Sequence, residues 1–475
     1  MHKFTQISDM PSMVYVSPKM IDDRVEASYY RKQYLDVDEK IVTFNNGFMY
    51  LKNLCTKITD GTHKTPDYKP EGIKFITAKN ILEDGIDFED VKYISKDEHN
   101  EISKRCKVEP GDMLFTKVGR IGYAKVVPAN VPNFSIFVSV ALLKLKGNVD
   151  SRFIEAFLNS KYGRIQSERL VKGSNQPDFH LEDIAEIKVP IPSPEIQKYI
   201  GDKVRKAEEL REEAKRLIKE AEEILYSQLK QEQYLEKQKS IVNKYIWLSD
   251  KEVDTRIDSQ YYKPNYILYK HILNKNGIKT KKIKDVVKDI RTGTTPQSNY
   301  ITKDEKRIKF LRVNNLGYCM LEKDDMLYVN DKYDEKKLKI IPKGDILVSI
   351  AGTLGRSSVV DMDNCTTNQN IAALTLKNIN FIKPYYLSLY LNSYFGYLSL
   401  DTISTQATVK YINNELLGEI EIPLIDIDIQ LIIEEKIAKY KNKINKSKQL
   451  IQEAKQDVED LIEGNFDMSK VRANS

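Results

Sequence analysis

The sequence has few of the apolar and cysteine features that mark membrane or secreted proteins. Its longest apolar run, FSIFVSVALL at Phe134–Leu143, is about half of the ~20 residues that a membrane-spanning helix needs. The first residues, MHKFTQISDM, hold no apolar core, so we expect no cleaved secretion signal. The four cysteines, Cys55, Cys106, Cys319 and Cys365, lie far apart, which argues against a CxxC zinc site or a disulfide framework. We therefore expect a cytoplasmic protein with free thiols.

Catalytic motifs are missing as well. The sequence contains no GxxxxGK(S/T) phosphate loop, no GxGxxG after a strand, no HExxH metal motif and no GxSxG nucleophile elbow. It also lacks the Asn/Asp-Pro-Pro-aromatic tetrapeptide that is typical of enzymes that methylate the amino groups of DNA bases. We therefore expect a chain that is not an enzyme and that holds no metal ion or cofactor of its own.

The composition is that of a folded protein. Of the 475 residues, 41% are apolar and 30% are charged, and the 16 prolines and 20 glycines are too few for a fibrous or low-complexity chain. This length predicts two or three domains. The formal net charge of +6 is too small to indicate a nucleic-acid partner by itself, so the location of the excess charge matters more.

An internal repeat organises the chain. The segment RVEASYY at Arg24–Tyr30 resembles RIDSQYY at Arg256–Tyr262, 232 residues later, and ITDGT at Ile58–Thr62 resembles IRTGT at Ile290–Thr294 at the same offset. Other landmarks 233 residues apart are GRIG (119–122) with GTLG (352–355), and LNS (158–160) with LNS (391–393). Because two such offsets nearly fill the chain, the sequence predicts one structural unit present in two copies.

Each copy changes its pattern once along its length. Short β-branched and aromatic runs punctuated by Gly, Pro, Asn and Asp predict strands and turns, and a long helical pattern follows them. We predict an α+β fold with two tandem mixed α/β domains separated by two long helices. The predicted boundaries are 1–193 for the first domain, 194–245 for the first long helix, 246–425 for the second domain and 426–475 for the second long helix.

The two long helices carry complementary apolar seams. Apolar residues that alternate at three- and four-residue spacing are typical of coiled coils. The predicted packing residues are Ala207, Leu210, Ala214, Leu217, Ala221 and Ile224 in the first helix, and Ile437, Tyr440, Ile444, Ile451, Ala454 and Val458 in the second. We predict an antiparallel coiled coil within the chain that works as a spacer. An ordinary helical linker or a homodimeric coiled coil is the alternative.

The excess positive charge lies outside these helices. Residues 195–239 hold 11 basic and 11 acidic residues, and residues 426–463 hold 7 basic and 9 acidic residues. The surplus therefore belongs to the two mixed domains. That distribution favours a polyanion as the partner of both domains.

Four loop-like segments in each copy combine residues that read DNA bases with residues that bind phosphates. Arg, Lys, Asn and Gln read guanine and adenine edges, whereas Lys, Arg, Ser and Thr also bind phosphates. The candidates in the first copy are Lys57, Thr62, His63, Lys64, Lys79, Asn80, Lys117, Arg120, Lys172, Ser174, Asn175 and Gln176. Those in the second copy are Arg291, Thr294, Thr295, Gln297, Arg312, Asn314, Asn315, Thr353, Arg356, Thr405, Gln406, Thr408 and Lys410. The equivalent loops of the two copies carry different side chains, as expected if the two domains recognise different DNA sequences. The alternative is that these segments are ordinary polar loops.

Two short patterns admit a second interpretation. Asp178, Glu186 and Lys188 resemble the two acids and the lysine of Mg²⁺-dependent nucleases. The second copy has Glu421 where the first has Lys188, which favours a structural role. The GRIG segment at 119–122 resembles the phosphate-clamping GxxG loop of one RNA-binding module, but its position between two strand-like runs favours a tight hairpin turn.

Taken together, the chain resembles the specificity subunits of type I restriction–modification systems over essentially its whole length. The motifs that carry the resemblance are ITDGTH (58–63), EPGDMLF (109–115), GSNQP (173–177) and PIPSPEIQ (190–197), with KGDIL (343–347) and IPL (422–424) in the second copy. The second copy departs from the GSNQP motif, with Ala407 and Thr408 in the place of Pro177. The resemblance implies two target recognition domains that each bind one half of a split double-stranded DNA site, and a coiled coil that sets the gap between the halves.

The resemblance also implies partners and their cofactors. Two methyltransferase subunits would dock on the coiled coil and methylate adenine N6 with S-adenosylmethionine. A restriction motor–nuclease subunit would join them and use ATP and Mg²⁺. The sequence leaves alternatives open: a recognition subunit of a type II-like or methylation-only complex, a coiled-coil interaction protein without DNA binding, and the nuclease described above.

Overall fold

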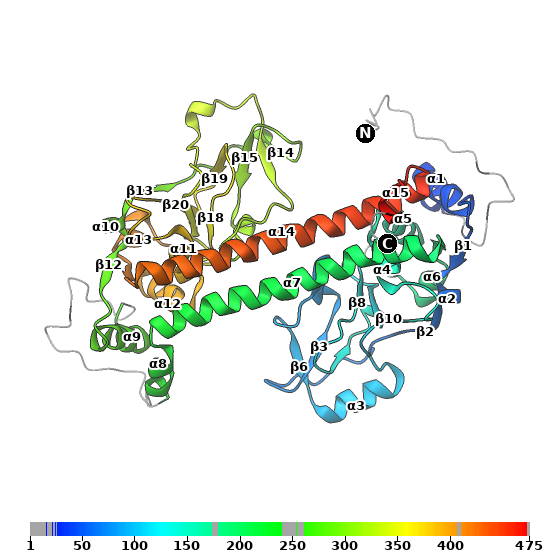
Figure 1. Ribbon diagram of the computed structural model, residues 1–475, viewed down its shortest axis with the longest axis horizontal. Helices are drawn as coiled ribbons and strands as arrows, with labels where there is room; N and C mark the ends of the chain where they lie inside the picture. Colours follow the sequence, from blue (N-terminus) through cyan, green and yellow to red (C-terminus); the bar gives the residue numbers. More distant parts are fainter. Residues whose placement is uncertain are drawn as a thin grey trace. The chain divides into compact units, whose positions relative to one another are not determined.

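The computed structural model describes residues 16, 21, 24, 26–172, 179–239, 253, 261–405 and 410–472 (Figure 1). The chain divides into two compact units: unit 1 comprises Met1–Arg211 and Asn445–Ser475, and unit 2 comprises Glu212–Ile444. This division runs through the long helices, so the boundaries expected at 193, 245 and 425 stay predictions. The four cysteines are buried and carry free thiols. Among the described residues, no helix is long and apolar enough to span a membrane.

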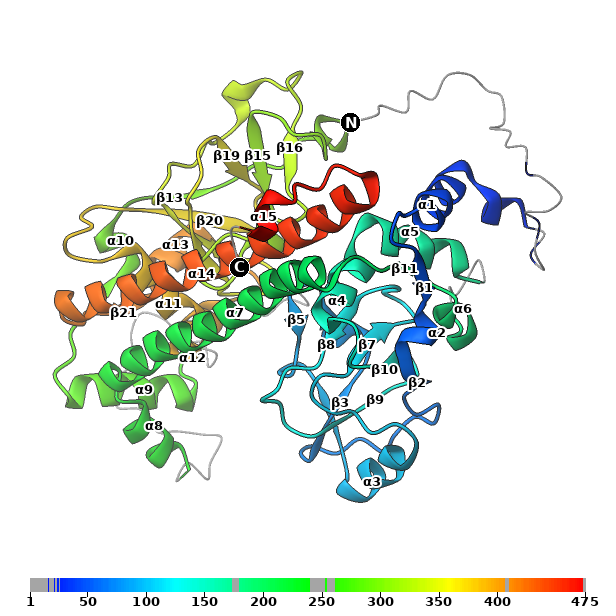
Figure 2. The same ribbon diagram turned by 45° about the vertical axis from the view of Figure 1, so that its right-hand side comes forward.

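Unit 1 is built around a four-stranded antiparallel sheet (Figure 2). Its strands, in spatial order, are β2 (Cys55–Asp60), β10 (Val140–Leu145), β7 (Met113–Thr116) and β8 (Ala124–Val126). Successive side chains of a strand point to opposite faces of the sheet. Met113, Phe115 and Leu143 therefore join the core under the helices, whereas Leu114 and Leu142 join a second core. Both faces of this sheet are buried.

A smaller sheet forms the second core with the larger one. Its strands are β6 (Lys92–Ile94), β3 (Ile73–Ile76) and β9 (Phe134–Ile136), of which β3 and β9 run parallel. Ile76 and Ile136 share one hydrophobic cluster with Leu142 of the larger sheet. The same side of unit 1 carries the hairpin of β4 (Ile81–Leu82) and β5 (Gly85–Ile86), and helix α3 (Lys96–Arg105).

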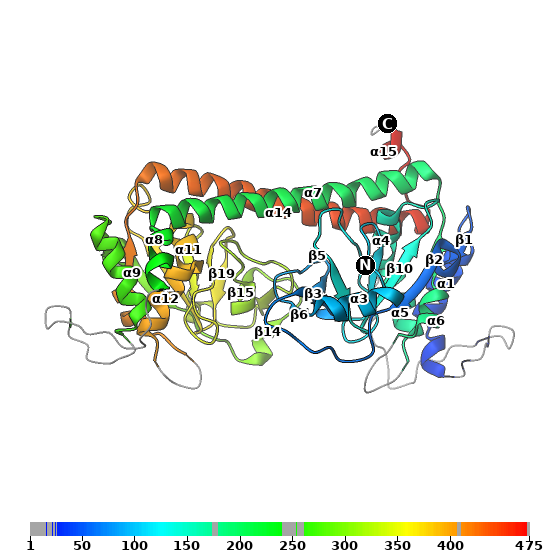
Figure 3. The same cartoon turned by 90° about the horizontal axis from the view of Figure 1, so that it is seen from below.

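Helices cover the other face of the larger sheet. These are α4 (Ser151–Asn159), α5 (Lys161–Leu170) and the first part of α7 (Pro194–Gln228). Figure 3 shows α4 next to α7. Further elements of unit 1 are η2 (Ala27–Tyr30), α1 (Lys32–Val42), α2 (Leu51–Leu54), α6 (Leu181–Ala185) and the antiparallel pair β1 (Phe48–Tyr50) and β11 (Lys188–Pro190).

Unit 2 repeats this architecture. Its larger sheet comprises β13 (Val287–Thr292), β20 (Ile371–Leu376), β17 (Ile346–Ser349) and β18 (Ser357–Val359), in that order. Its smaller sheet comprises β14 (Ile301–Thr302), β16 (Leu327–Val329), β15 (Ile308–Leu311) and β19 (Cys365–Thr367), with β15 and β19 parallel. Further elements of unit 2 are α9 (Pro264–Lys275), β12 (Thr280–Lys282), α10 (Ile283–Val286), α11 (Pro384–Asn392), α12 (Tyr394–Ile403), α13 (Asn414–Glu419) and β21 (Glu421–Pro423). The predicted α+β fold and its internal repeat are confirmed by this shared topology.

The repeated LNS landmark fastens a helix to an edge strand. The side-chain amide of Asn159 donates to Ala124 O at 2.8 Å, and Asn159 Oδ1 accepts from Ala124 N at 3.1 Å. In unit 2, the amide of Asn392 donates to Ser357 O at 2.7 Å and Asn392 Oδ1 accepts from Ser357 N at 3.1 Å. An asparagine is needed here because its amide carries both a donor and an acceptor.

The GxxG landmarks are hairpin turns. Gly119 and Gly122 connect β7 to β8 with φ of 77° and 80°, and Gly352 and Gly355 connect β17 to β18 with φ of 72° and 84°. Glycine adopts this left-handed backbone without the steric cost that other residues meet. The turn interpretation of the sequence therefore holds, and these loops need no phosphate ligand to explain their glycines.

The long helices α7 and α14 (Ile427–Glu463) run antiparallel within each unit. The contacts in unit 1 are Lys203 with Asp457 and the Ser447 hydroxyl with Ala207 O, and those in unit 2 are Glu213 with Lys443 and Glu220 with Lys436. In both units the residue number on α14 falls as the number on α7 rises. This direction agrees with the predicted antiparallel coiled coil.

The alanine seam of α7 is buried along its length. Ala207, Ala214 and Ala221 have no exposed surface. Of the other predicted packing residues, Ile437, Ala454 and Val458 are fully buried and Ile451 nearly so, whereas Leu210, Leu217, Ile224, Tyr440 and Ile444 are partly exposed. Leu225 is fully buried, so the seam continues through this residue rather than through its neighbour Ile224.

Both long helices end earlier than the sequence predicted. α7 ends at Gln228, and Lys230 adopts a left-handed φ of 58° before α8 (Gln231–Gln238) begins. α14 ends at Glu463 and is followed by Gly464, with a φ of 77°, and by the short α15 (Ser469–Arg472). A left-handed residue turns the chain away from the helix axis. The single helices predicted over 194–245 and 426–475 are therefore wrong in extent, and residues 240–245 and 473–475 lie outside the described part.

Candidate nucleic-acid interface

Loop segments of unit 1 meet at one edge of the larger sheet. β2 and β7 both run antiparallel to β10, so both end at this edge, where the chain passes from β9 to β10. That connection joins the loops: Thr62 N donates to Ile136 O at 3.1 Å, Lys117 N donates to Ser139 O at 2.9 Å, and Ala78 N donates to Ser139 Oγ at 3.1 Å. We call residues 61–64, 77–80, 117–120 and 137–139 loop edge 1.

Unit 2 has the equivalent edge. β13 and β17 both run antiparallel to β20, and the connection from β19 to β20 joins the loops. Ile350 N donates to Asn370 O at 2.9 Å, and the Thr295 hydroxyl donates to the side chain of Gln369. Ile412 N donates to Ile350 O at 2.9 Å. We call residues 293–297, 312–315, 350–356, 368–370, 404–405 and 410–412 loop edge 2.

A glycine is required at the start of each edge. A Cβ atom on Gly61 would lie 2.0 Å from Ile136 O, and one on Gly293 would lie 1.9 Å from Thr367 O. Such distances are far below van der Waals contact, so only glycine lets the backbone after β2 or β13 lie against the neighbouring connection. This close approach explains the glycine in the repeated ITDGT and IRTGT segments.

Several predicted residues of loop edge 1 are exposed to solvent. His63, Lys64, Lys79 and Arg120 are exposed, and Thr62 is partly exposed. The Arg120 guanidinium lies 4.4 Å from the ring centroid of Tyr123, an arrangement in which the ring steadies the cation. Lys57 lies outside the edge on β2, where its Nζ donates to Arg105 O at 2.6 Å.

Three predicted residues of the two edges are buried instead. Lys117 is 5% exposed, and Asn80 and Asn315 are 1% exposed. Asn80 Oδ1 accepts from Thr77 N at 3.0 Å, and Asn315 Oδ1 accepts from Arg312 N at 2.9 Å. These amides hold the short 3₁₀ turns η3 (Ala78–Asn80) and η5 (Val313–Asn315). The burial of all three side chains argues against direct contacts of Asn80, Asn315 and Lys117 with DNA.

The predicted residues of loop edge 2 are mostly exposed. This exposed group comprises Thr294, Thr295, Gln297, Asn314, Thr353, Arg356 and Thr405. Loop edge 2 thus presents hydroxyls and amides where loop edge 1 presents more cations. Hydroxyls and amides both donate and accept hydrogen bonds, whereas Lys and Arg only donate.

Three further cations of unit 2 are paired with acids. Arg291 Nη2 lies 2.6 Å from Asp345 Oδ2, and Arg312 Nη2 lies 2.9 Å from Asp325 Oδ2. Burial raises the pKa of Asp345 although Thr375 and Arg291 oppose this shift. Lys410 pairs with Asp401 and donates to Tyr397 Oη at 3.2 Å, and the Asp401 bond comes first among the causes that raise the pKa of Lys410. These pairs fix side chains at or beside loop edge 2.

A fourth segment of each copy is only partly described. In unit 1, Phe179 N donates to Lys117 O at 3.0 Å, which places Phe179 beside loop edge 1. Lys172 Nζ lies 2.9 Å from Asp183 Oδ2. The predicted residues Ser174, Asn175, Gln176, Gln406 and Thr408 lie outside the described residues.

Sequence reasoning missed an acid–base cluster at loop edge 1. The carboxylate of Asp60 lies 3.0 Å from Arg105 Nη1, 3.2 Å from His63 Nε2 and 3.6 Å from Lys117 Nζ. Asp60 is part of the ITDGT motif, but Arg105 comes from the end of α3. No local sequence pattern marks this contact, because the two residues are 45 positions apart.

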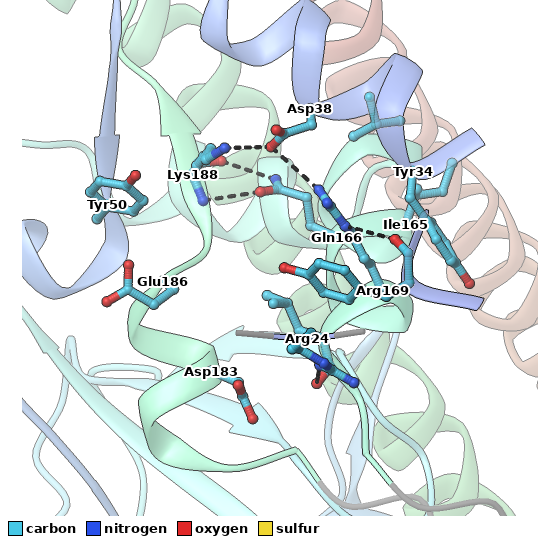
Figure 4. Close-up of a pocket in the computed structure, with 13 residues that line it drawn as sticks. Arg24, Tyr34, Asp38, Tyr50, Ile165, Gln166, Arg169, Asp183, Glu186 and Lys188 are labelled. Atoms are coloured by element: carbon cyan, nitrogen blue, oxygen red, sulfur yellow. Dashed lines mark hydrogen bonds and ion pairs between the residues drawn. The ribbon is translucent and has the colours of Figure 1, made fainter. Parts of the chain in front are cut away.

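Two residues of the nuclease-like pattern, Lys188 and Glu186, are paired with other side chains, and Figure 4 shows Lys188 beside Asp38. Lys188 Nζ lies 2.5 Å from Asp38 Oδ1, and Glu186 Oε1 lies 2.5 Å from Lys52 Nζ. Asp178 is outside the described residues. No group of three His, Cys, Asp or Glu residues that could hold a metal ion occurs in the part of the chain that the structure describes.

Unit 2 keeps one of these ion pairs and exchanges the acid and the base of the other. Glu419 pairs with Lys282 at 2.6 Å and also with Lys284, as Glu186 pairs with Lys52. Lys270 Nζ lies 3.0 Å from Glu421 Oε1, so the acid and the base of the Asp38–Lys188 pair have exchanged places. A pair that survives such an exchange has a structural role rather than a catalytic one.

A comparison with a known protein family agrees with the repeat. The family model described as "Type I restriction modification DNA specificity domain" matches residues 45–223 and again residues 275–456. Among solved structures, the S subunit of a type I restriction–modification system from M. genitalium is 15% identical, with a TM-score of 0.44 over 90% of this chain and 98% of that one. The HsdS subunit from Thermoanaerobacter tengcongensis is 15% identical, with a TM-score of 0.29 over 88% and 97% of the two chains.

Proposed function

The chain belongs to the family of type I restriction–modification DNA specificity domains, and from this premise we propose that each unit reads one half of a split DNA site through its loop edge. The function of the chain is the recognition of DNA sequence, and it is a non-catalytic component of its complex. It assembles with other subunits of the restriction–modification system.

The observation that supports the split site is the contrast between shared scaffold and different edges. Both edges are assembled by equivalent backbone hydrogen bonds, such as Lys117 N to Ser139 O and Ile350 N to Asn370 O. Their exposed side chains differ, with Lys79 in one edge and Asn314 in the place that corresponds to it. Since lysine favours guanine or phosphate and asparagine favours adenine, the two units suit different half-sites.

The partners and the location extend the same proposal. Two methyltransferase subunits, which use S-adenosylmethionine to methylate adenine N6, dock on the paired long helices. A restriction motor–nuclease subunit that uses ATP and Mg²⁺ completes the complex, and the assembly works in the cytoplasm. The long helices set the gap between the half-sites, so insertion of one heptad into both helices widens the gap in the methylated sequence.

The deciding experiment is a methylome comparison by single-molecule sequencing. The host is sequenced with the gene intact and with the gene deleted. Loss of one split methyl-adenine motif supports the proposal and gives both half-sites. An unchanged methylome, together with a purified complex whose DNA affinity does not fall as salt rises, contradicts it and favours an interaction protein without DNA binding.

Assignment of the half-sites uses single variants in each edge. Lys79→Ala and Arg120→Ala should alter only the first half-site, and Asn314→Ala and Arg356→Ala only the second. Loss of one good bidentate base contact reduces discrimination by about 1–3 kcal/mol. A variant of loop edge 2 that changes the first half-site would show that the units are assigned to the wrong halves.

A further inference from the structure

A buried acid that is surrounded by basic side chains lies beside loop edge 1. Asp60, at the end of β2, is 3% exposed. Its carboxylate faces Arg105 from α3, His63 from the loop after β2, and Lys117 from the loop after β7. A buried carboxylate is stable only when it is paired and hydrogen-bonded. Asp60 therefore ties three separate segments together through charge.

The guanidinium of Arg105 is fixed at three acceptors. Its Nη1 donates to Asp60 Oδ1 at 3.0 Å and to Thr59 Oγ1 at 3.2 Å, and its Nη2 donates to Gly61 O. The side chain of Arg105 is nevertheless 51% exposed. A guanidinium has five N–H donors. The three acceptors fix the orientation of the group, and the rest of it still faces solvent.

The cation of this cluster that reaches solvent is Arg105. The side chain of Lys117 is only 7% exposed, whereas that of Arg105 is 51% exposed. The guanidinium of Arg105 also lies directly beside Gly61 of loop edge 1, since its Nη2 donates to Gly61 O. Its positive charge is therefore open to a ligand from solvent.

Unit 2 lacks the basis for such a cluster at the equivalent positions. The position equivalent to Asp60 at the end of β2 is Thr292 at the end of β13. The position equivalent to Lys117 is Ile350, which is fully buried. The cluster is thus a feature of loop edge 1 and not of the shared scaffold. Residues that the scaffold does not need are candidates for a role in binding.

We infer that Arg105 binds a backbone phosphate of the DNA beside the first half-site, and that Asp60 is the positioning residue that holds it there. Arginine binds phosphate oxygens through charge-assisted hydrogen bonds, and such contacts fix the register of a protein on DNA without reading its sequence. The inference deepens the proposed function and rests on it, since it assumes that loop edge 1 faces DNA.

The test is a salt titration of DNA affinity with Arg105→Gln in the complex with the methyltransferase partner. The probe is a duplex that carries both half-sites. Loss of one phosphate contact should lower the slope of log affinity against log salt by about 1. The ratio of affinities for the correct duplex and for one with a scrambled first half-site should stay unchanged.

Lys104→Gln is the matched control. Lys104 is a neighbouring cation on the same helix, its side chain is 71% exposed, and its Nζ lies 2.5 Å from Glu101. Its removal changes the net charge by the same amount as Arg105→Gln. Equal losses in the two variants would show that general charge, and not a contact of Arg105, carries the effect, and would overturn the inference.

The role of Asp60 is tested by a double-mutant cycle. Asp60→Asn should weaken DNA binding when Arg105 is present and should cause no further loss in the Arg105→Gln background. Circular dichroism and unfolding midpoints establish that each variant is folded, and His63→Gln, at a 68% exposed side chain, probes the same cluster if Asp60→Asn does not fold. Additive losses in the cycle would contradict the positioning role.

Two further outcomes overturn the inference and are distinguishable from failure of the proposed function. If Arg105→Gln keeps the wild-type slope and affinity, Arg105 makes no contact although the complex reads DNA. If the variant relaxes only the first half-site and keeps the slope, Arg105 reads a base instead. Absence of any salt-dependent binding by the wild-type complex would instead refute the proposed function itself.

Discussion

The contact between the larger sheet and its first helix is built differently in the two units. In unit 1, Lys125 Nζ of β8 lies 2.7 Å from Glu155 Oε1 of α4, and both side chains are at most 4% exposed. In unit 2, two serines, Ser358 and Ser388, stand at these positions, and the Ser358 hydroxyl donates to Met320 O at 2.9 Å. A buried position can therefore carry charge or hydroxyls, provided that both partners change together.

The exchanged ion pairs give the same lesson at the protein surface. Asp38 and Lys188 in unit 1 correspond to Lys270 and Glu421 in unit 2. Either order of charge satisfies the site, because the attraction depends on the product of the charges. Between the units, the scaffold conserves complementarity rather than residue identity.

The largest effect is expected from breaking the buried pair of unit 1. Lys125→Met leaves the Glu155 carboxylate buried without its cation, which should lower the free energy of unfolding by about 3–5 kcal/mol. The double variant Lys125→Ser with Glu155→Ser, which copies unit 2, should cost less than this single change. Denaturant unfolding measures both, with Ser358→Ala as the control in unit 2. A single variant as stable as the wild type would show that the pair contributes nothing.

A smaller effect is expected from the glycines of the loop edges. Gly61→Ala and Gly293→Ala force a Cβ against a backbone oxygen, and we expect each to destabilise its own unit by about 1–3 kcal/mol. Each should also impair recognition of only one half-site, which methylation of half-scrambled duplexes reports. Gly147→Ala, where a Cβ would meet nothing within 4 Å, is the control. Equal effects of Gly61→Ala and Gly147→Ala would refute the role of the close approach.

Breaking the Lys270–Glu421 pair of unit 2 is expected to change the free energy of unfolding by about 1 kcal/mol. Glu421→Lys places two cations together in unit 2 and should lower the free energy of unfolding by about that amount, since the pair is partly exposed. Adding Lys270→Asp, which restores the order found in unit 1, should recover most of the loss. If the double variant is no more stable than the single one, the two sites are not interchangeable.

The smallest effect concerns pH. Burial alone would raise the pKa of Asp401, but the hydrogen bonds from Lys263 and Lys410 outweigh it and lower the pKa. A carboxylate whose folded pKa is lowered stabilises the fold above its unfolded pKa, about 4, and loses this contribution as the pH falls through that range.

The corresponding measurement compares the wild type with Asp401→Asn. The difference in their free energies of unfolding should be present at neutral pH and should shrink as the pH falls below about 4. Glu168→Gln is the control, since Glu168 occupies the equivalent position of unit 1 and is exposed. A difference that stays constant with pH would rule out the carboxylate as its source.

The features that could be predicted from the sequence are those that the repeat marks twice. The glycines at 61 and 293 and the asparagines at 159 and 392 recur because the backbone geometry demands one residue type. The alanine seam of α7 was readable because its period is local. Features of this kind can be predicted because a short stretch of sequence contains the residues that the local structure requires.

Other features depend on contacts that no short window contains. Asn80 and Asn315 look like adenine readers, yet their amides hold 3₁₀ turns. Arg105 reaches Asp60 only because the end of α3 lies beside the end of β2. The end of α7 was missed because Lys230, a residue that ordinarily favours helices, takes the left-handed conformation there.

The loop edges are held together largely by main-chain groups, as in the bonds from Thr62 N to Ile136 O and from Ile350 N to Asn370 O. Every amino acid except proline supplies the same N–H and C=O. Mutation of most exposed side chains at these edges therefore leaves the framework of hydrogen bonds untouched. Substitutions that change the target sequence can therefore accumulate here with little loss of stability, and the exposed residues of one unit can diverge independently of those of the other.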